Sequence, residues 1–104
     1  MNVKNKLILV ACGSGIASSH IALHRIEDRL AAFGIEHVTL KAIPYIKAQL
    51  LSREAAVFVN LSPNDGIAYA CPVVNGIPFL SGFGMDEAML ELKLVLEKEA
   101  VGDT

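Results

Sequence analysis

A cysteine followed by small residues is the part of this sequence with the clearest chemical potential. Cys12 begins the stretch Cys-Gly-Ser-Gly-Ile-Ala-Ser-Ser, which separates a short apolar run from a segment with helical periodicity. Backbone N–H groups in such a turn can converge on one point, and the N-terminus of the following helix adds a partial positive charge there. This arrangement binds a phosphoryl group, and the same field lowers the pKa of a thiol below its ordinary value of about 8.5.

We therefore predict that Cys12 is a nucleophile in its thiolate form and that the loop after it is a phosphate cradle. Glycines in this loop let the backbone approach an anion with no Cβ in the way. Ser14 and Ser18 are the best candidates for additional hydroxyl donors. The simpler alternative is that Cys12 is a small buried apolar residue. The predicted phosphate-binding residues are Gly13, Ser14, Gly15, Ile16, Ala17, Ser18 and Ser19.

The loop lacks the partner residues of three related sites. Tyrosine phosphatases carry an arginine six residues after the cysteine, where this chain has Ser18. A thioredoxin-type site needs a second cysteine where this chain has Gly15, and the Gly-Lys-Ser/Thr of a Walker A loop is absent. The loop can hold a phosphoryl group but lacks the guanidinium that drives its hydrolysis, which favours a carrier over a hydrolase.

Four other residues have chemical potential, and each also has a structural interpretation. Cys71 has no glycines or helix start beside it, so we expect it to be structural. His20 and His24 lie one helical turn apart, but no third metal ligand is evident, so we interpret them as surface residues and expect no metal. His20 is close enough to the loop to be an alternative contact for the anion or the thiol. Asp65 precedes Gly66 and is interpreted as a turn former, with a catalytic acid as the alternative.

The elements that must position Cys12 alternate between strands and helices. Residues 6–11 form an apolar strand, and strands are also expected at 37–42, 55–59 and 73–80. The last of these is interrupted at Asn75-Gly76, and Pro78 places it at a sheet edge. Pro44 opens a short helix to about residue 51, and residues 60–66 form a loop.

Two longer helices complete the pattern. The first has an apolar face and ends before Gly34, a typical C-cap; its predicted core residues are Ala22, Leu23, Ile26, Leu30 and Phe33. The last spans about residues 86–99, with a core stripe of Met85, Ala88, Met89, Leu92 and Leu96. Leu90 and Leu94 form a second stripe, which we interpret as packing against a neighbouring loop, with a docking surface as the alternative.

This order predicts an α/β fold with an open, four-stranded, mainly parallel sheet and helices on both faces, in three Rossmann-like layers. Functional sites of such sheets lie at the carboxyl ends of the strands, where Cys12 follows the first strand. The 104 residues fit one domain, 1–104.

Composition excludes several classes of function. The charges nearly balance, with 9 Lys+Arg against 11 Asp+Glu, and no basic cluster indicates nucleic acid as a partner. The longest strongly apolar run is residues 7–12. A membrane-spanning helix needs about 20 apolar residues, so this run is far too short. We find no signal peptide and expect a cytoplasmic protein with free thiols, no cofactor and no membrane insertion of its own.

The chain resembles the enzyme IIB component of the bacterial phosphoenolpyruvate-dependent sugar phosphotransferase system, in its galactitol-type branch. The opening strand ends in Val-Ala-Cys-Gly before a loop of small residues, and residues 73–84 read Val-Val-Asn-Gly-Ile-Pro-Phe-Leu-Ser-Gly-Phe-Gly. That run is similar to the family's Val-x-Gly-x-Pro-Phe-x-Ser-Gly-x-Gly, and the total length fits one IIB domain. Residues 62–71 match the family less clearly.

The resemblance implies a phosphocarrier. A IIA protein or domain would carry phosphate on a histidine, Cys12 would accept it, and the phosphate would pass to a polyol held by the membrane-embedded IIC transporter. The implied fold is similar to that of low-molecular-weight tyrosine phosphatases, and the implied location is cytoplasmic, peripheral to the inner membrane through IIC. Galactitol or a related sugar alcohol is the implied substrate. The alternatives are a small cysteine-dependent phosphatase and a non-catalytic regulatory module of the same fold.

Overall fold

Four parallel strands form the sheet of the computed structural model, which describes residues 6–13, 16–35, 38–62 and 66–102. The strands lie in the order β2-β1-β3-β4, so that β1 is interior and β2 and β4 are edges. The bounds are β1 (Lys6–Ala11), β2 (Val38–Ala42), β3 (Val57–Asn60) and β4 (Val73–Asn75). A central position suits β1 because its sequence is almost continuously apolar. The predicted open parallel sheet is confirmed.

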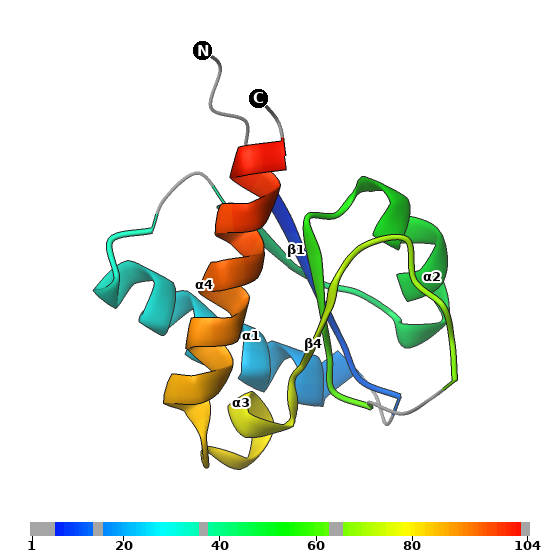
Figure 1. Ribbon diagram of the computed structural model, residues 1–104. Helices are drawn as coiled ribbons and strands as arrows, with labels where there is room; N and C mark the ends of the chain where they lie inside the picture. Colours follow the sequence, from blue (N-terminus) through cyan, green and yellow to red (C-terminus); the bar gives the residue numbers. More distant parts are fainter. Residues whose placement is uncertain (1–5, 14–15, 36–37, 63–65, 103–104) are drawn as a thin grey trace.

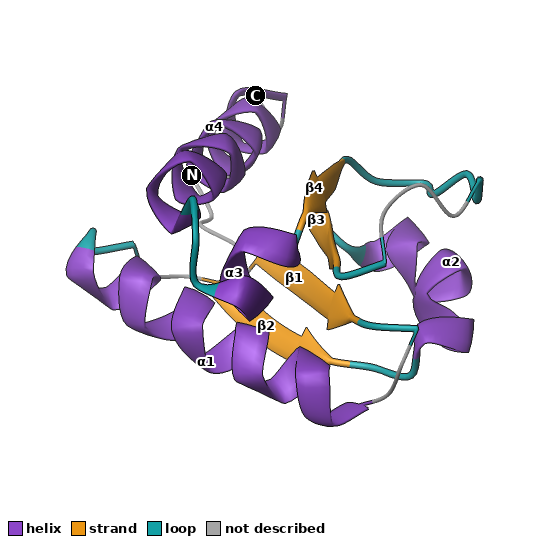
Figure 2. Cartoon of the chain, turned by 90° about the horizontal axis from the view of Figure 1, so that it is seen from below, coloured by secondary structure: helices purple, strands orange, loops and turns teal. Residues whose placement is uncertain are grey.

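Helical segments cover both faces of the sheet, which gives the three predicted layers (Figures 1 and 2). One face carries the helices α1 (Ile16–Ala32), α3 (Ile77–Ser81) and α4 (Met85–Gly102). The other face carries η1 (Tyr45–Lys47), α2 (Ala48–Leu51) and η2 (Ser52–Glu54). Pro44 precedes this second group, as predicted, and the group extends three residues beyond the expected end.

The side chains of β1 alternate between two hydrophobic cores, as expected for successive residues of a strand. Ile8 and Val10 belong to the larger core under α1 and α4, and both are fully buried. Leu9 and Ala11 belong to the smaller core under the η1–η2 segment. Because β1 is buried on both faces, the start of the loop after it is fixed at the sheet's carboxyl edge.

Helix α1 follows its predicted apolar stripe except at the end. Ala22, Leu23, Ile26 and Leu30 are buried against the sheet. Phe33 is 47% exposed, so its predicted place in the core is wrong. The helix ends at Ala32, although the N–H of Phe33 still donates to the carbonyl of Arg29 at 3.0 Å. The chain then turns at Gly34 with φ of 70°, and Ile35 rather than Phe33 packs against the core.

The segment after β4 is a helix, so the strand predicted for residues 78–80 is wrong. β4 ends at Asn75, and α3 begins at Ile77 with Pro78 in its first turn. Proline suits this position because its fixed φ is helical and no intrahelical partner awaits its missing N–H. The Asn75 Oδ1 accepts the N–H of Ile77 at 3.0 Å, which satisfies one donor of the new helix.

Gly76 makes the sharp turn from β4 into α3 possible. A Cβ at this position would lie 2.6 Å from Leu61 Cδ2 and 2.7 Å from Val59 Cγ1. The backbone therefore passes directly over the side chains of β3 and the residue after it. The Asn75-Gly76 pair identified in the sequence is a junction between strand and helix rather than a break within a strand.

Arg25 ties α1 to the end of α3. Its Nη1 donates to the carbonyl oxygens of Phe79 and Leu80, each at 2.8 Å. Carbonyls at the C-terminal end of a helix have no intrahelical donor, so this guanidinium satisfies two groups that the helix leaves open. Phe79 itself is fully buried in the larger core and anchors α3 to the sheet.

Helix α4 buries its predicted core stripe and exposes the second one. Ala88, Met89, Leu92 and Leu96 are buried, and Met85 packs against them. Leu90 and Leu94 are 56% and 58% exposed, so their interpretation as packing residues is wrong. Within the described residues, this side of α4 faces solvent.

Candidate functional site

Cys12 lies at the point predicted for it, directly after the interior strand β1 and ahead of helix α1. The residue is 6% exposed and belongs to the larger core. The adjacent Gly13 is exposed. The thiol is thus seated at the carboxyl edge of the sheet, with the protein core beneath it and the loop opening to solvent beside it.

Helix α1 begins inside the predicted cradle. Its first residue is Ile16, so residues 16–19 form its first turn rather than an irregular loop. The first four N–H groups of a helix have no intrahelical acceptor and carry the positive end of its dipole. These backbone donors are therefore of the type that the cradle requires. Ser14 and Gly15 lie outside the described residues, so their predicted contacts stay predictions.

The three described side chains of this first turn differ in exposure. Ala17 is exposed, Ser18 is half-buried and Ser19 is fully buried. Ser18 thus keeps a hydroxyl near the surface, as the prediction requires. The hydroxyl of Ser19 lies in the interior, so this side chain does not face the exposed side of the loop.

Ser62 is a site residue that the sequence did not reveal. Its Oγ accepts the N–H of Gly13 at 2.9 Å and lies 4.0 Å from the Sγ of Cys12. Its own N–H donates to the Oδ1 of Asn60 at 2.8 Å, and Asn60 is 2% exposed. The signal that could have found it is the Asn-x-Ser turn at the carboxyl end of the strand next to β1.

Gly13 allows the close approach of these two loops. A Cβ at Gly13 would lie 3.0 Å from Ser62 Oγ, in the space that the hydrogen bond needs. The glycine predicted to open the backbone to an anion thus also accommodates a neighbouring hydroxyl. Position 13 therefore has a packing reason to be glycine, in addition to the chemical one.

Of the other candidates, Cys71 lies apart from Cys12. Cys71 is buried in the smaller core with Leu9 and Phe58, on the opposite face of the sheet, as expected of a structural residue. His20 and His24 are exposed on α1 with ring centroids 6.5 Å apart. The Nδ1 of His24 lies 3.6 Å from Oε1 of Glu27, a solvent-exposed pair. Among the residues that the structure describes, no three His, Cys, Asp or Glu side chains come together as metal ligands. Asp65 lies outside the described residues.

Comparison with known proteins agrees with the fold. Residues 7–70, more than half of the chain, match the family described as "PTS system, Lactose/Cellobiose specific IIB subunit". The chain belongs to this family of IIB subunits. It is also 30% identical over 95 residues to SgcB of Escherichia coli (strain K12), which is provisionally named a phosphotransferase enzyme IIB component. That match covers 88% of this chain and 97% of SgcB.

Family membership gives the coarse function of the IIB subunit. It is a transferase of a sugar phosphotransferase system. As a IIB subunit, it works with a IIA and a IIC partner. The parallel sheet and its helices are those expected of a IIB domain, and the matched residues include all of β1 but its first residue, the Cys12 loop and Ser62. Residues 73–84, on which the resemblance to the galactitol-type branch rests, lie beyond the matched stretch. Within the described ranges, no helix is both long enough and apolar enough to cross a bilayer.

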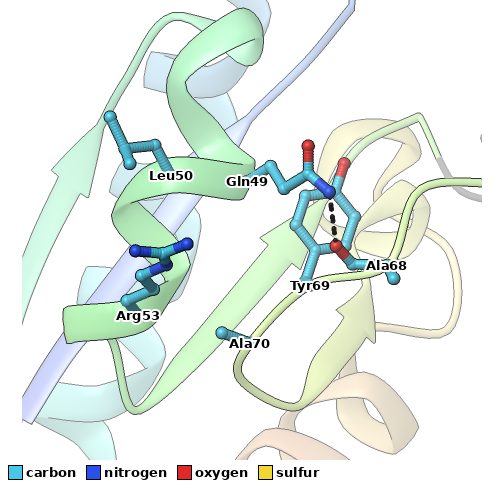
Figure 3. A pocket seen from close by; sticks show the side chains of 6 residues that line it. All are labelled: Gln49, Leu50, Arg53, Ala68, Tyr69 and Ala70. Carbon is cyan, nitrogen blue, oxygen red and sulfur yellow. Dashed lines mark hydrogen bonds between the residues drawn. The ribbon is translucent and has the colours of Figure 1, made fainter.

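A pocket of the IIB domain lies away from the cysteine. It has a volume of about 440 Å³ and opens between α2–η2 and the segment before β4 (Figure 3). Gln49 reaches across it, and its Nε2 donates to the carbonyl oxygen of Ala68 at 2.9 Å. Its lining residues are Gln49, Leu50, Arg53, Ala68, Tyr69 and Ala70. Cys12 is not among them.

Proposed function

We propose that the IIB subunit carries the phosphoryl group on Cys12. The observation that supports this most is the position of the thiol between the end of an interior strand and the first turn of α1. Backbone donors and the helix dipole favour both the thiolate and its phosphorylated product there. The cradle is proposed to consist of residues 13–19, through backbone N–H groups and the hydroxyls of Ser14 and Ser18.

The transfer consists of two displacements at phosphorus. The Cys12 thiolate attacks the phosphorus of a IIA phosphohistidine, the S–P bond forms, and the P–N bond breaks to release the imidazole. A sugar hydroxyl held by IIC then attacks the same phosphorus. The O–P bond forms, the S–P bond breaks, and Cys12 leaves as a thiolate while the hydroxyl proton passes to a base of the partner. No residue of this chain needs to activate water.

A cysteine phosphatase is the first alternative, and the contacts of Arg25 disfavour it. Position 18, where a phosphatase has its arginine, is serine, and Arg25 is the next arginine along the chain. Its Nη1 is bound to two carbonyl oxygens of α3, so this guanidinium is engaged in a structural contact. Turnover of an aryl phosphate by the purified protein would support a phosphatase, whereas a carrier shows none.

The second alternative is a regulatory module with an inert cysteine. A thiolate held by the loop reacts with an alkylating reagent well below the ordinary thiol pKa of about 8.5, whereas an inert buried thiol resists. Phosphorylation by phosphoenolpyruvate, the general phosphotransferase proteins and a cognate IIA tests the proposal directly. Intact-protein mass spectrometry then shows one added phosphoryl group on a carrier and none on a regulatory module.

We propose a polyol, galactitol or a related sugar alcohol, as the final acceptor. The support is the likeness of residues 73–84 to the galactitol-type run, which here forms β4, the Gly76 junction and α3. The description of the matched family names lactose and cellobiose, so the two substrate classes should be compared. Membranes with the cognate IIC are supplied with labelled galactitol or cellobiose. Phosphorylation of the polyol supports the proposal, and phosphorylation of cellobiose alone contradicts it.

The partner surface is proposed to surround Cys12 at the carboxyl edge of the sheet. It comprises residues 63–67 and part of residues 81–84, of which the described residues Gly66, Ile67 and 81–84 are exposed. Phe83 is 83% exposed, a large apolar side chain available for contact with a protein. Transient complexes of this kind bury small areas. We further propose that the chain acts as one IIB domain in the cytoplasm, at the membrane only through IIC.

A further inference from the structure

The hydroxyl of Ser62 connects the end of β3 to the cysteine loop. Its Oγ is 2.9 Å from the backbone nitrogen of Gly13 and 4.0 Å from the Sγ of Cys12. Ser62 is half-buried, and no part of the phosphate cradle predicted from the sequence includes it. Its position raises the question of what this hydroxyl does for the thiol.

The backbone of Ser62 is held by a hydrogen bond to Asn60 at the end of β3. Its backbone N–H donates to Asn60 Oδ1, and Asn60 is buried at the last paired position of β3. The carbonyl of Asn60 in turn accepts the N–H of Gly76 at 2.8 Å, so this residue is held by two strands. The serine is therefore tied by a hydrogen bond to the last residue of β3, which is itself bonded to the residue after β4.

The protonation state of Cys12 determines whether the Ser62 hydroxyl donates or accepts in this pair. A serine has one O–H donor and two acceptor lone pairs. One lone pair receives the Gly13 N–H, which leaves the proton free to be directed elsewhere. A thiol can donate to Ser62 or accept from it, but a thiolate has no proton and can only accept. When Cys12 is ionised, the Ser62 O–H is therefore the donor of this pair.

We propose that Ser62 is a positioning residue for Cys12. It holds the start of the cysteine loop through the Gly13 N–H, and it stabilises the thiolate by donating its O–H to Sγ. Hydrogen bonds to the charged form of a group favour ionisation, so removal of the hydroxyl raises the pH at which Cys12 ionises. The importance of this for phosphoryl transfer rests on the proposed function, but the effect on the thiol does not.

Other titratable side chains also affect the ionisation of Cys12, so the test must leave them unchanged. A Cβ added at Gly13 would lie 3.9 Å from Cδ2 of the Tyr45 ring. Lys6 lies at the start of β1. Substitutions at Ser62 leave all of these groups in place, so their fields cancel when variants are compared. The titratable residues of α1 are His20, His24, Arg25, Glu27, Asp28 and Arg29.

The test measures the rate of Cys12 alkylation by iodoacetamide against pH, with all variants carrying Cys71→Ser so that one thiol remains. We expect Ser62→Ala to raise the midpoint by about one pH unit, which is roughly a tenfold slower reaction below both midpoints. Ser62→Thr keeps the hydroxyl and should restore the midpoint. Thermal unfolding of each variant confirms that it is folded.

A matched control comes from the next strand. Asn75→Ala removes a side chain-to-backbone hydrogen bond at the end of β4 that has the same i to i+2 spacing as the one at Asn60. It should leave the alkylation midpoint unchanged. If Ser62→Ala does not fold, Ser62→Val and Ser62→Thr provide a pair of equal shape that differs in the hydroxyl.

The outcomes are distinct. A raised midpoint in the variants without a hydroxyl, restored by threonine, supports the proposal. An unchanged midpoint, or an equal shift with Asn75→Ala, overturns it. Phosphorylation by IIA is measured in parallel on the wild type, where absence of a phosphoryl group contradicts the proposed function and leaves the result for the thiol intact.

Discussion

Ala11 and Asn60 are paired at the ends of β1 and β3, and the N–H of the next residue, Leu61, donates to the carbonyl of Ala11 at 2.9 Å. The two strands therefore end at the same level. One residue beyond this pair, the chain reaches Cys12 on one strand, and two residues beyond, it reaches Ser62 on the other. The register of the central strands, rather than any contact of the loops alone, brings the thiol and the hydroxyl together.

The close approach of the two loops predicts a strong effect at Gly13. In Gly13→Val the new Cβ would lie 3.0 Å from Ser62 Oγ, and two methyl groups would crowd the same space. Crowding of this kind costs about 1–3 kcal/mol. We expect phosphorylation by IIA to be roughly ten to a hundred times slower, measured as phosphoprotein formed over time.

Ser14→Ala is the matched comparison for this prediction. Its hydroxyl is one proposed donor among several, and one hydrogen bond contributes about 1 kcal/mol. The expected loss is a few-fold. A loss at Ser14→Ala equal to that at Gly13→Val would contradict the backbone cradle and favour recognition by side chains.

Two phenylalanines of the same short region should differ in their contribution to stability. Phe79 belongs to α3 and is fully buried, whereas Phe83 is 83% exposed. We expect Phe79→Ala to lower the free energy of unfolding by about 3–5 kcal/mol, and Phe83→Ala to change it by less than about 0.5 kcal/mol. Urea denaturation followed by circular dichroism measures both. Equal losses would mean that α3 is not anchored as described.

Phe83 should instead matter for the partner. Truncation of an apolar contact residue at an interface costs more than about 1 kcal/mol when that residue is important for binding. This corresponds to binding of IIA that is weaker by about fivefold or more. Titration with phosphorylated IIA measures the concentration at half-maximal rate in Phe83→Ala. Leu94→Ala is the control, because Leu94 is also exposed but lies on α4. A larger effect at Leu94 would move the partner surface to α4.

The parts of the fold that the sequence predicted correctly are those with a single strong pattern. The continuous apolar run of β1 indicated a central strand, and the spacing of Ala88, Leu92 and Leu96 indicated the buried stripe of α4. Cys12 could be placed at the carboxyl edge of the sheet because it follows the apolar run directly. These features depend on local periodicity, which one sequence is enough to show.

The errors arose where tertiary context decides. Residues 77–80 contain a proline and β-favouring side chains, and only the close passage of Gly76 over β3 shows that the chain has left the sheet. Leu90 is apolar but exposed, because periodicity identifies a stripe without showing what lies opposite it. Ser62 lies 50 residues from Cys12 in the sequence, so its contact depends on strand order and register.

The most direct measurement of the central claim compares Cys12→Ser with Cys71→Ser. A serine at position 12 keeps the shape of the side chain, but its hydroxyl ionises too weakly to attack a phosphohistidine without a base. Each variant and the wild type are incubated with phosphoenolpyruvate, the general phosphotransferase proteins and a cognate IIA, and intact masses are recorded. One added phosphoryl group should appear on the wild type and on Cys71→Ser, and none on Cys12→Ser. A phosphoryl group that persists in Cys12→Ser, on His20 or His24 for example, would contradict the assignment of Cys12 as the acceptor.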